Sequence, residues 1–171
     1  FGKIGGWGGS YGGTTMFATM GGKIIDKSSS MGSTLDKTVA DTRIKATVGI
    51  VPYMGDTNSP TVMGRKTSIF GWGHSGAQAV IGPYLAIAGT TDTRAVYDYT
   101  NEVLETAKGE MYLIKCEGEG HELSKGAYQD ARTWALTFLN AHVDGNKSEL
   151  EKFQQMLSVE GGAEDVFVEI E

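Results

Sequence analysis

Several kinds of residue are scarce in this sequence, and their scarcity limits what the chain can be. Of its 171 residues, one is a cysteine and three are histidines. A single cysteine excludes an internal disulfide and any cysteine-rich metal site. This residue, Cys116, lies in an apolar strand-like run, so we interpret it as a buried structural thiol. The residues that bind metals form no cluster along the sequence, so a metal cofactor has no support. A nucleotide cofactor has none either, because no glycine-rich loop with a phosphate-binding lysine is present.

An excess of positive charge and long apolar runs are missing too. The net charge is -6 and no large basic cluster occurs, so neither nucleic acid nor an anionic membrane surface is expected as a partner. No apolar stretch approaches the length of a membrane span. An apolar fraction of 40% over 171 residues is enough for the core of one domain. We therefore expect a single domain over residues 1–171, with an acidic tail at 160–171.

What the sequence does contain is the glycine-rich stretch Gly8-Gly9-Ser10-Tyr11-Gly12-Gly13. It follows a strand-like run at 3–7 and precedes small and apolar residues typical of a helix. Strand, Gly-x-Ser-x-Gly, then helix is the context of a nucleophile elbow, a sharp turn in which Gly8 and Gly12 are expected to leave room for neighbouring backbone. The helix dipole and free amides there favour a developing negative charge. Ser10 is thus a candidate nucleophile, although an ordinary glycine-rich loop can also contain a serine.

Strand-like and helix-like segments alternate along the rest of the chain. Strands are predicted at 3–7, 44–51, 84–89 and 111–116, and helices at 12–20, 95–107, 127–142 and from 148 onward. This alternation predicts an α/β fold with a mostly parallel sheet and helices on both faces. Functional sites in such sheets lie at the carboxyl ends of the strands. Three of these ends carry reactive side chains, namely Ser10, Asp92 and His121.

A serine hydroxyl needs an imidazole to accept its proton and a carboxylate to orient that imidazole. His121 is the best candidate base, because it lies on a glycine-containing loop directly after a predicted buried strand. His142 lies on the apolar stripe of a helix, which is more typical of a core or boundary histidine. For the carboxylate, Asp92 directly follows the strand at 84–89, and Asp56 is the alternative.

A second, partial match to the elbow pattern is Gly73-His74-Ser75-Gly76-Ala77. Ser75 lies only 17 residues before Asp92, and Pro83 begins a new strand between them. That spacing leaves no room for the helix, strand and loop that normally separate a nucleophile from its acid. Ser75 is therefore the weaker candidate, and its alternative role is a turn. It belongs to a long irregular segment at 53–82, which we interpret as a cap or pocket wall.

These motifs together resemble the C-terminal half of an α/β-hydrolase. The matching stretches are Gly-Gly-Ser-Tyr-Gly-Gly, Arg43-Ile44-Lys45-Ala46 leading to Pro52, Pro83 to Asp92, and Gly118-Glu119-Gly120-His121. Within that superfamily the chain is similar, from Lys3 to about His142, to the dienelactone-hydrolase-like group. That group includes cutinase-type polyester hydrolases and platelet-activating-factor acetylhydrolase-like esterases. The order serine, acid, histidine is also that of the α/β-hydrolase triad.

The resemblance implies a role for each of four residues. Ser10 would be the nucleophile, His121 the general base and then acid, and Asp92 the orienting carboxylate. The amide of Tyr11 would be one donor of the oxyanion hole. The chain departs from the family because the strands that normally precede the elbow, and the loop that supplies the second oxyanion donor, are missing.

Without those strands, the strand at 3–7 would be left as an exposed sheet edge. We therefore expect a partner polypeptide to complete the sheet, most economically the N-terminal half of the same hydrolase as a separate or cleaved chain.

The functional hypothesis is a serine carboxylester hydrolase that acts on a small-molecule or polymeric ester through an acyl-enzyme. Candidate walls of its substrate pocket are Tyr53, Met54, Phe70 and Trp72, while Trp7 is better interpreted as a core residue. An acyltransferase or a peptidase would use the same residues. The alternative from another class is a non-catalytic binding or assembly module, because a fold by itself does not determine a function.

Overall fold

The computed structural model of the protein describes residues 2–25, 34, 38–55, 59, 61–62, 64–159 and 165–170. Its elements follow one another in the order β1 (Ile4–Gly9), α1 (Tyr11–Thr19), β2 (Ile44–Ile50), β3 (Thr61–Val62), β4 (Arg65–Ser68), β5 (Gly71–Trp72), the 3₁₀ helix η1 (Ser75–Ala79), β6 (Tyr84–Gly89), α2 (Tyr97–Thr106), β7 (Met111–Cys116), α3 (Lys125–Asp144), α4 (Lys147–Val159) and β8 (Asp165–Ile170). The predicted α/β class is confirmed.

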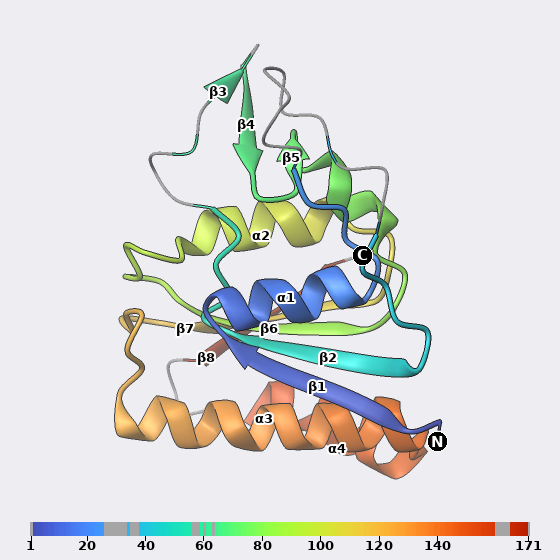
Figure 1. The fold of residues 1–171 in the computed structure, drawn as a ribbon. Coiled ribbons are helices and arrows are strands. Elements are labelled where there is room, and N and C mark those ends of the chain that lie inside the picture. The colour runs from blue at the N-terminus through green and yellow to red at the C-terminus, as the bar shows by residue number, and fades with distance from the viewer. Residues whose placement is uncertain are drawn as a thin grey trace.

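A five-stranded sheet with the order β1-β2-β6-β7-β8 runs through the molecule (Figure 1). The first four strands are parallel to one another, and they are the four strands that the sequence predicts. The fifth strand, β8, pairs antiparallel with β7. It lies within the segment that we expected to be an acidic tail, and its hydrogen-bonded position was not foreseen. Every residue of β6 is buried, as befits a parallel strand covered by helices on both faces.

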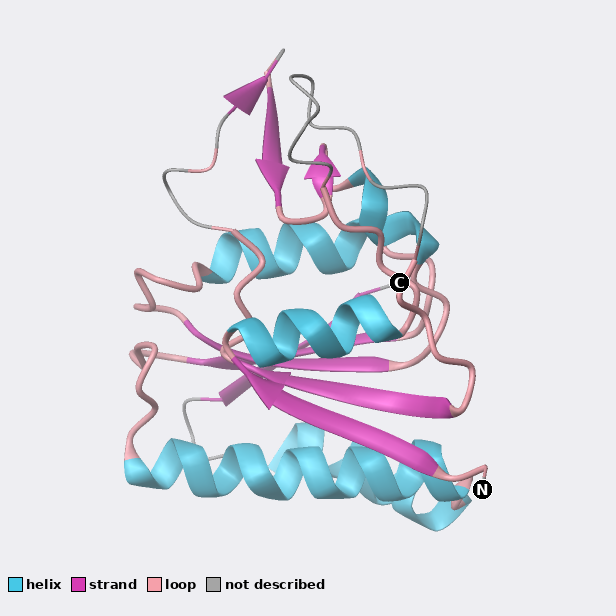
Figure 2. Cartoon of the chain, viewed as in Figure 1, coloured by secondary structure: helices cyan, strands magenta, loops and turns pink. Residues whose placement is uncertain are grey.

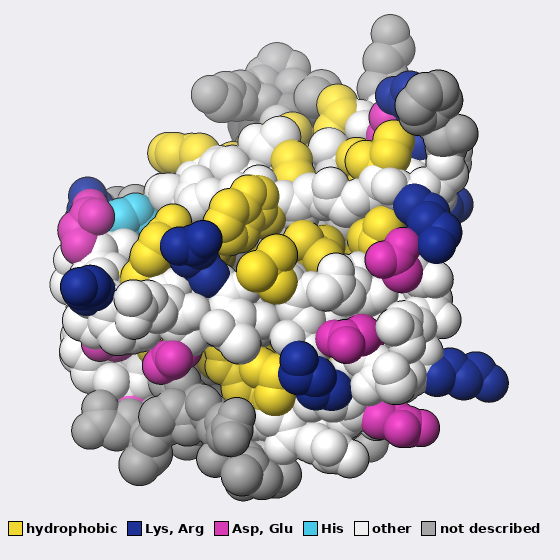
Figure 3. Space-filling model, turned by 90° about the horizontal axis from the view of Figure 1, so that it is seen from below, with side chains coloured by type: hydrophobic (Ala, Val, Ile, Leu, Met, Phe, Trp, Pro, Cys, Tyr) yellow, Lys and Arg dark blue, Asp and Glu magenta, His cyan; other side chains and the backbone are white. Residues whose placement is uncertain are grey.

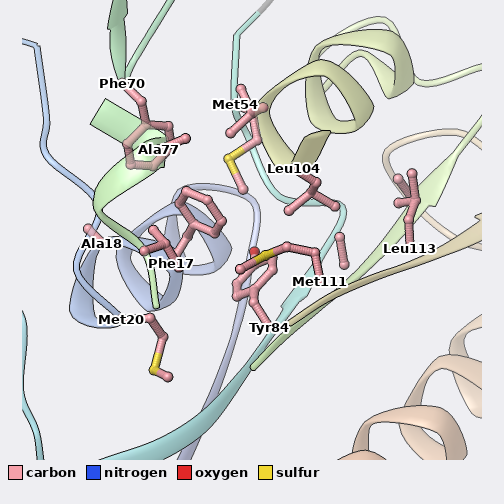
Figure 4. Close-up of a cluster of buried hydrophobic side chains, with 14 residues drawn as sticks. Phe17, Ala18, Met20, Met54, Phe70, Ala77, Tyr84, Leu104, Met111 and Leu113 are labelled. Carbon is pink, nitrogen blue, oxygen red and sulfur yellow. The ribbon is translucent and has the colours of Figure 1, made fainter. Parts of the chain in front are cut away.

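Helices cover both faces of this sheet (Figure 2). One face carries α1 and α2, and the opposite face carries α3, with α4 packed beside it. Each face therefore encloses its own hydrophobic core. In the first core, the ring of Phe17 packs edge-on against the rings of Phe70 and Tyr84, at centroid distances of 4.8 and 4.9 Å (Figure 4). This packing fixes α1, and hence the turn before it, on the sheet.

The segment at 53–82, expected to be irregular, contains ordered structure. It includes a small antiparallel sheet, β3-β4-β5, followed by η1. Glu102 of α2 fastens this segment, because its carboxylate pairs with Lys66 of β4 and lies 3.3 Å from Nε2 of the buried His74. The segment therefore packs on α2, above the sheet in Figure 1, rather than forming a free loop.

The strand β1 lies at the edge of the main sheet, and within the described ranges only β2 pairs with it. Its side chains are largely exposed, including Ile4 and Trp7. Its glycines allow close packing: a Cβ on Gly5 would lie 2.8 Å from the side chain of Val143 on α3, and one on Gly6 would lie 2.6 Å from Met16 on α1. Helices thus approach β1 closely at Gly5 and Gly6, and within the described ranges no strand pairs with its outer side.

Candidate active site

Ser10 forms the whole connection between β1 and α1. Its backbone has φ 51° and ψ -121°, a conformation that costs a non-glycine residue about 1–3 kcal/mol. Three backbone hydrogen bonds hold it: the Ser10 N–H donates to Ile50 O at 3.0 Å, and the Ser10 carbonyl accepts from Thr14 N at 3.2 Å and from Tyr53 N at 3.1 Å. The turn is therefore as sharp as the sequence pattern predicts, and neighbouring segments fix it from two sides.

The glycines around Ser10 contribute unequally to this turn. A Cβ on Gly8 would lie 2.4 Å from the carbonyl carbon of Gly12, so the expected close backbone approach at Gly8 is confirmed. A Cβ on Gly12 would meet nothing within 4 Å, so the expectation that Gly12 also leaves room for backbone is wrong. The second tight position is Gly13, whose Cβ would lie 2.8 Å from Pro52 and 3.0 Å from Gly49.

His121 and Asp92 meet where β6 and β7 end. The Nδ1 atom of His121 lies 2.7 Å from Oδ2 of Asp92. The carboxylate of Asp92 is fully buried, and its Oδ1 accepts the backbone N–H groups of Arg94 and Ala95 at 2.8 Å each. In the tautomer that carries its proton on Nδ1, this nitrogen donates to Asp92, and Nε2 is left as a proton acceptor.

A cavity of about 440 Å³ brings Ser10 and His121 together. Its other walls are mostly apolar and come from the end of β1, the end of β2, the loop after β7 and the start of α3. The lining residues are Trp7, Gly8, Gly9, Ser10, Ile50, Val51, His121, Glu122, Leu123 and Tyr128. Asp92 is outside this lining and is connected to the cavity through its hydrogen bond to His121. The three residues that the sequence analysis selected thus lie at the same end of the sheet, where its parallel strands have their carboxyl ends.

None of the four candidate pocket walls lines this cavity. Met54 and Phe70 are fully buried in the core beside α1, and so do not line the cavity (Figure 4). The Arg65 guanidinium lies 5.0 Å over the ring of Trp72, away from the cavity lining. Tyr53 stacks on Tyr11 at a centroid distance of 4.6 Å and is held next to the turn, but it too is absent from the lining.

Trp7 was expected in the core, but it is 49% exposed and lines the cavity. The reason is the position of β1 at the edge of the sheet, where the described part of the chain places a strand, β2, on one side of it only. The sequence analysis also missed Leu123 and Tyr128 as lining residues. Their nearness to His121 in the sequence was the available signal, because residues close in sequence to a residue that lines a cavity often line the same cavity.

The alternative candidates lie elsewhere. Ser75 is exposed at the start of η1, and His74 is turned toward Glu102. His142 packs against the ring of Phe138 at a centroid distance of 4.4 Å, which confirms it as a boundary residue of the core. Burial lowers the pKa of His142, although nearby Glu110 acts in the opposite direction. Asp56, the alternative acid, lies outside the described residues.

Backbone amides at the start of α1 are the available anion donors. Tyr11 is the first residue of α1, so its N–H has no acceptor within the helix. In the part of the chain that the structure describes, no group of three or more His, Cys, Asp or Glu side chains is arranged to hold a metal ion. None of the helices described has the length and apolar character of a membrane span. Comparison with protein-family models found no match to the chain, and comparison with curated proteins found none either.

Proposed function

We propose that the protein is a serine carboxylester hydrolase with Ser10, His121 and Asp92 as its triad. The observation that carries the proposal is the shared cavity: a serine on a strained strand-to-helix turn and a histidine held by a buried carboxylate line the same space. Such an arrangement is what nucleophilic acyl transfer needs. The wider proposal is that the fold corresponds to the C-terminal half of an α/β-hydrolase.

The chemistry would proceed in two halves. In the first, the Ser10 hydroxyl attacks the ester carbonyl while Nε2 of His121 takes its proton, and Asp92 stabilises the imidazolium that forms. The N–H of Tyr11 donates to the oxyanion, and His121 then returns the proton to the leaving alcohol. In the second half, water, deprotonated by His121, attacks the acyl-enzyme, releases the acid and regenerates Ser10.

The cavity supports an ester with an apolar part as the substrate, either a small molecule or a segment of a polymer. A volume of about 440 Å³ falls within the range of small-molecule sites. Trp7, Leu123 and Tyr128 supply apolar surface next to the reacting groups. Since three residues of the edge strand β1 line the cavity, a polypeptide that pairs with this edge would lie beside the cavity.

A partner polypeptide belongs to this proposal, namely the N-terminal half of the same hydrolase. The Ser10 N–H points toward β2, so the alternation of a strand directs the backbone groups of Trp7 and Gly9 away from it. Figure 3 looks from below onto the side of the sheet that carries α3, and it shows hydrophobic side chains between charged ones on that surface. A strand added beside β1 would satisfy these backbone groups and could carry the second oxyanion donor.

Amide hydrogen exchange combined with native mass spectrometry tests the partner. In the isolated chain the amides of Trp7 and Gly9 should exchange quickly, and in the complex they should become protected. Protection of both amides in a chain shown to be monomeric would contradict an open edge at β1.

The catalytic proposal is tested by labelling with a fluorophosphonate, followed by intact-mass and peptide analysis. We expect one adduct on Ser10 of the wild-type protein. Ser10→Ala should abolish the adduct and esterase turnover while the far-UV circular dichroism is retained. Ser75→Ala is the matched control, because Ser75 follows a histidine in the partial elbow match and is exposed. An adduct that survives Ser10→Ala would place the nucleophile on another residue, and the absence of an adduct from the wild type would favour a binding module. Either result would overturn the proposal.

A further inference from the structure

The loop that carries His121 is attached to the loop that carries Asp92 through backbone and threonine groups. Thr91 donates both its N–H and its hydroxyl to the carbonyl of Glu119, each at 2.9 Å. The hydroxyl of Thr90 accepts the N–H of Gly118 at 2.8 Å. The approach is so close that a Cβ on Gly89 would lie 2.3 Å from the Glu119 carbonyl oxygen. The backbone of Glu119, together with that of Gly118, therefore joins the histidine loop to the acid loop.

The side chain of Glu119 makes a second attachment, on the other side of His121. Its Oε2 accepts the N–H of Ser124 at 2.7 Å, and its Oε1 accepts the Ser124 hydroxyl at 2.7 Å. Ser124 is also the N-cap of α3, because its hydroxyl accepts the N–H of Ala127 at 3.3 Å. The carboxylate of Glu119 thus binds Ser124, five residues later, and the intervening chain, which includes His121, forms a closed hydrogen-bonded loop. We call this loop the ring.

We infer that Glu119 is a positioning residue, which holds the imidazole of His121 at Asp92 by joining its loop to both the acid loop and the start of α3. The position of the imidazole matters because small displacements of a catalytic group cost large factors in rate. The effect of Glu119 on turnover rests on the proposed function, whereas its effect on the geometry of the His121–Asp92 pair does not.

The charge state of Glu119 suits this role. The two hydrogen bonds from Ser124 lower the pKa of the Glu119 carboxyl below its ordinary value. The carboxylate is therefore ionised at neutral pH, and its bonds to Ser124 are charge-assisted. Glu117, two residues earlier, pairs with Lys115 and accepts the hydroxyl of Thr90 instead of groups of Ser124, so it offers a matched carboxylate in the same loop.

A simpler role for Glu119, stabilising the first turn of α3, is separated from positioning by a substitution at Ser124. Aspartate is a good N-cap, so Ser124→Asp keeps an acceptor for the N–H of Ala127. The same change removes the hydroxyl donor and places a carboxylate against Glu119, so it should break the ring while leaving α3 capped.

The geometric test is proton NMR of the His121 Nδ1–H. In the wild type this proton should give a downfield signal that exchanges slowly, since Asp92 accepts it. Glu119→Ala and Ser124→Asp should speed its exchange at least about tenfold or abolish the signal, Glu119→Gln should have a smaller effect, and Glu117→Gln should have none. A signal with wild-type exchange in folded Glu119→Ala would overturn the inference, as would an equal effect of Glu117→Gln.

The kinetic test uses the same variants with a chromogenic ester. Loss of positioning should lower kcat about tenfold or more with little change in KM, whereas a merely structural role would lower the amount of folded enzyme without this split. If the wild type neither turns over esters nor labels at Ser10, the proposed function fails, but the NMR comparison still decides the role of Glu119. An unchanged kcat in a Glu119→Ala variant whose NMR signal is lost would contradict the link between position and rate.

Discussion

The two outer glycines of the Gly-x-Ser-x-Gly turn should respond in opposite directions to the same substitution. A Cβ on Gly8 would lie 2.4, 2.5 and 2.9 Å from the carbonyl carbon, the carbonyl oxygen and the Cα of Gly12. Ordinary contacts of this kind lie at 3.4 Å or more, and backbone atoms cannot rotate away as a side chain can. Gly8→Ala therefore requires α1 to shift relative to β1.

The magnitudes follow from these contacts. Forcing a methyl group into a well-packed site typically costs about 1–3 kcal/mol, and we expect about 2 kcal/mol of destabilisation or more for Gly8→Ala. At Gly12, by contrast, the added methyl group meets nothing within 4 Å and the residue lies inside α1. There, alanine restricts the unfolded chain and favours the helix, so Gly12→Ala should stabilise the protein by about 0.5–1 kcal/mol.

Thermal unfolding followed by circular dichroism measures both effects. For a chain of this size 1 kcal/mol corresponds to about 2–4 °C, so Gly8→Ala should lower Tm by about 4–8 °C and Gly12→Ala should raise it by about 1–4 °C. The opposite signs are the informative result, because each variant is the control for the other. Equal shifts of Tm, or a larger loss at Gly12, would refute the argument from close approach.

Two further predictions concern ionisable groups. If Asp92 orients His121 as proposed, Asp92→Asn should lower kcat by a factor of about 10⁴, because an amide NH₂ facing Nδ1 favours the wrong tautomer. Steady-state kinetics with an ester measures this loss, and a loss of kcat below about tenfold would contradict the prediction. Burial lowers the pKa of His142 in the folded protein, so the unfolded chain binds the proton more readily. The free energy of unfolding should therefore fall as the pH drops below the ordinary pKa of 6.5 toward the lowered pKa of the folded state. Urea unfolding of the wild type and of His142→Phe at pH 7.5 and 5.5 measures this, and an equal pH dependence in both proteins would exclude His142 as the cause.

Much of the framework follows from local patterns in the sequence. The four parallel strands lie close to the predicted ranges, because apolar runs bounded by glycine, proline and polar residues are local signals. Ser10, Asp92 and His121 could be selected because each directly follows a strand, and parallel strands bring their carboxyl ends to one edge of the sheet. Their roles in catalysis remain a proposal that the labelling experiment decides.

What only the tertiary structure decided is which side of each element is covered. Met54 and Phe70 lie in the core and Trp7 lines the cavity, which is the reverse of the prediction. The burial of these side chains depends on the order of strands in the sheet and on how the segment at 53–82 packs against α1 and α2. In the same way, the sequence shows Gly8 and Gly12 as equivalent, yet only Gly8 faces another backbone. Whether a residue is apolar or a glycine is a property of that residue alone, whereas its burial and its close approach to other atoms depend on segments that are distant in the chain.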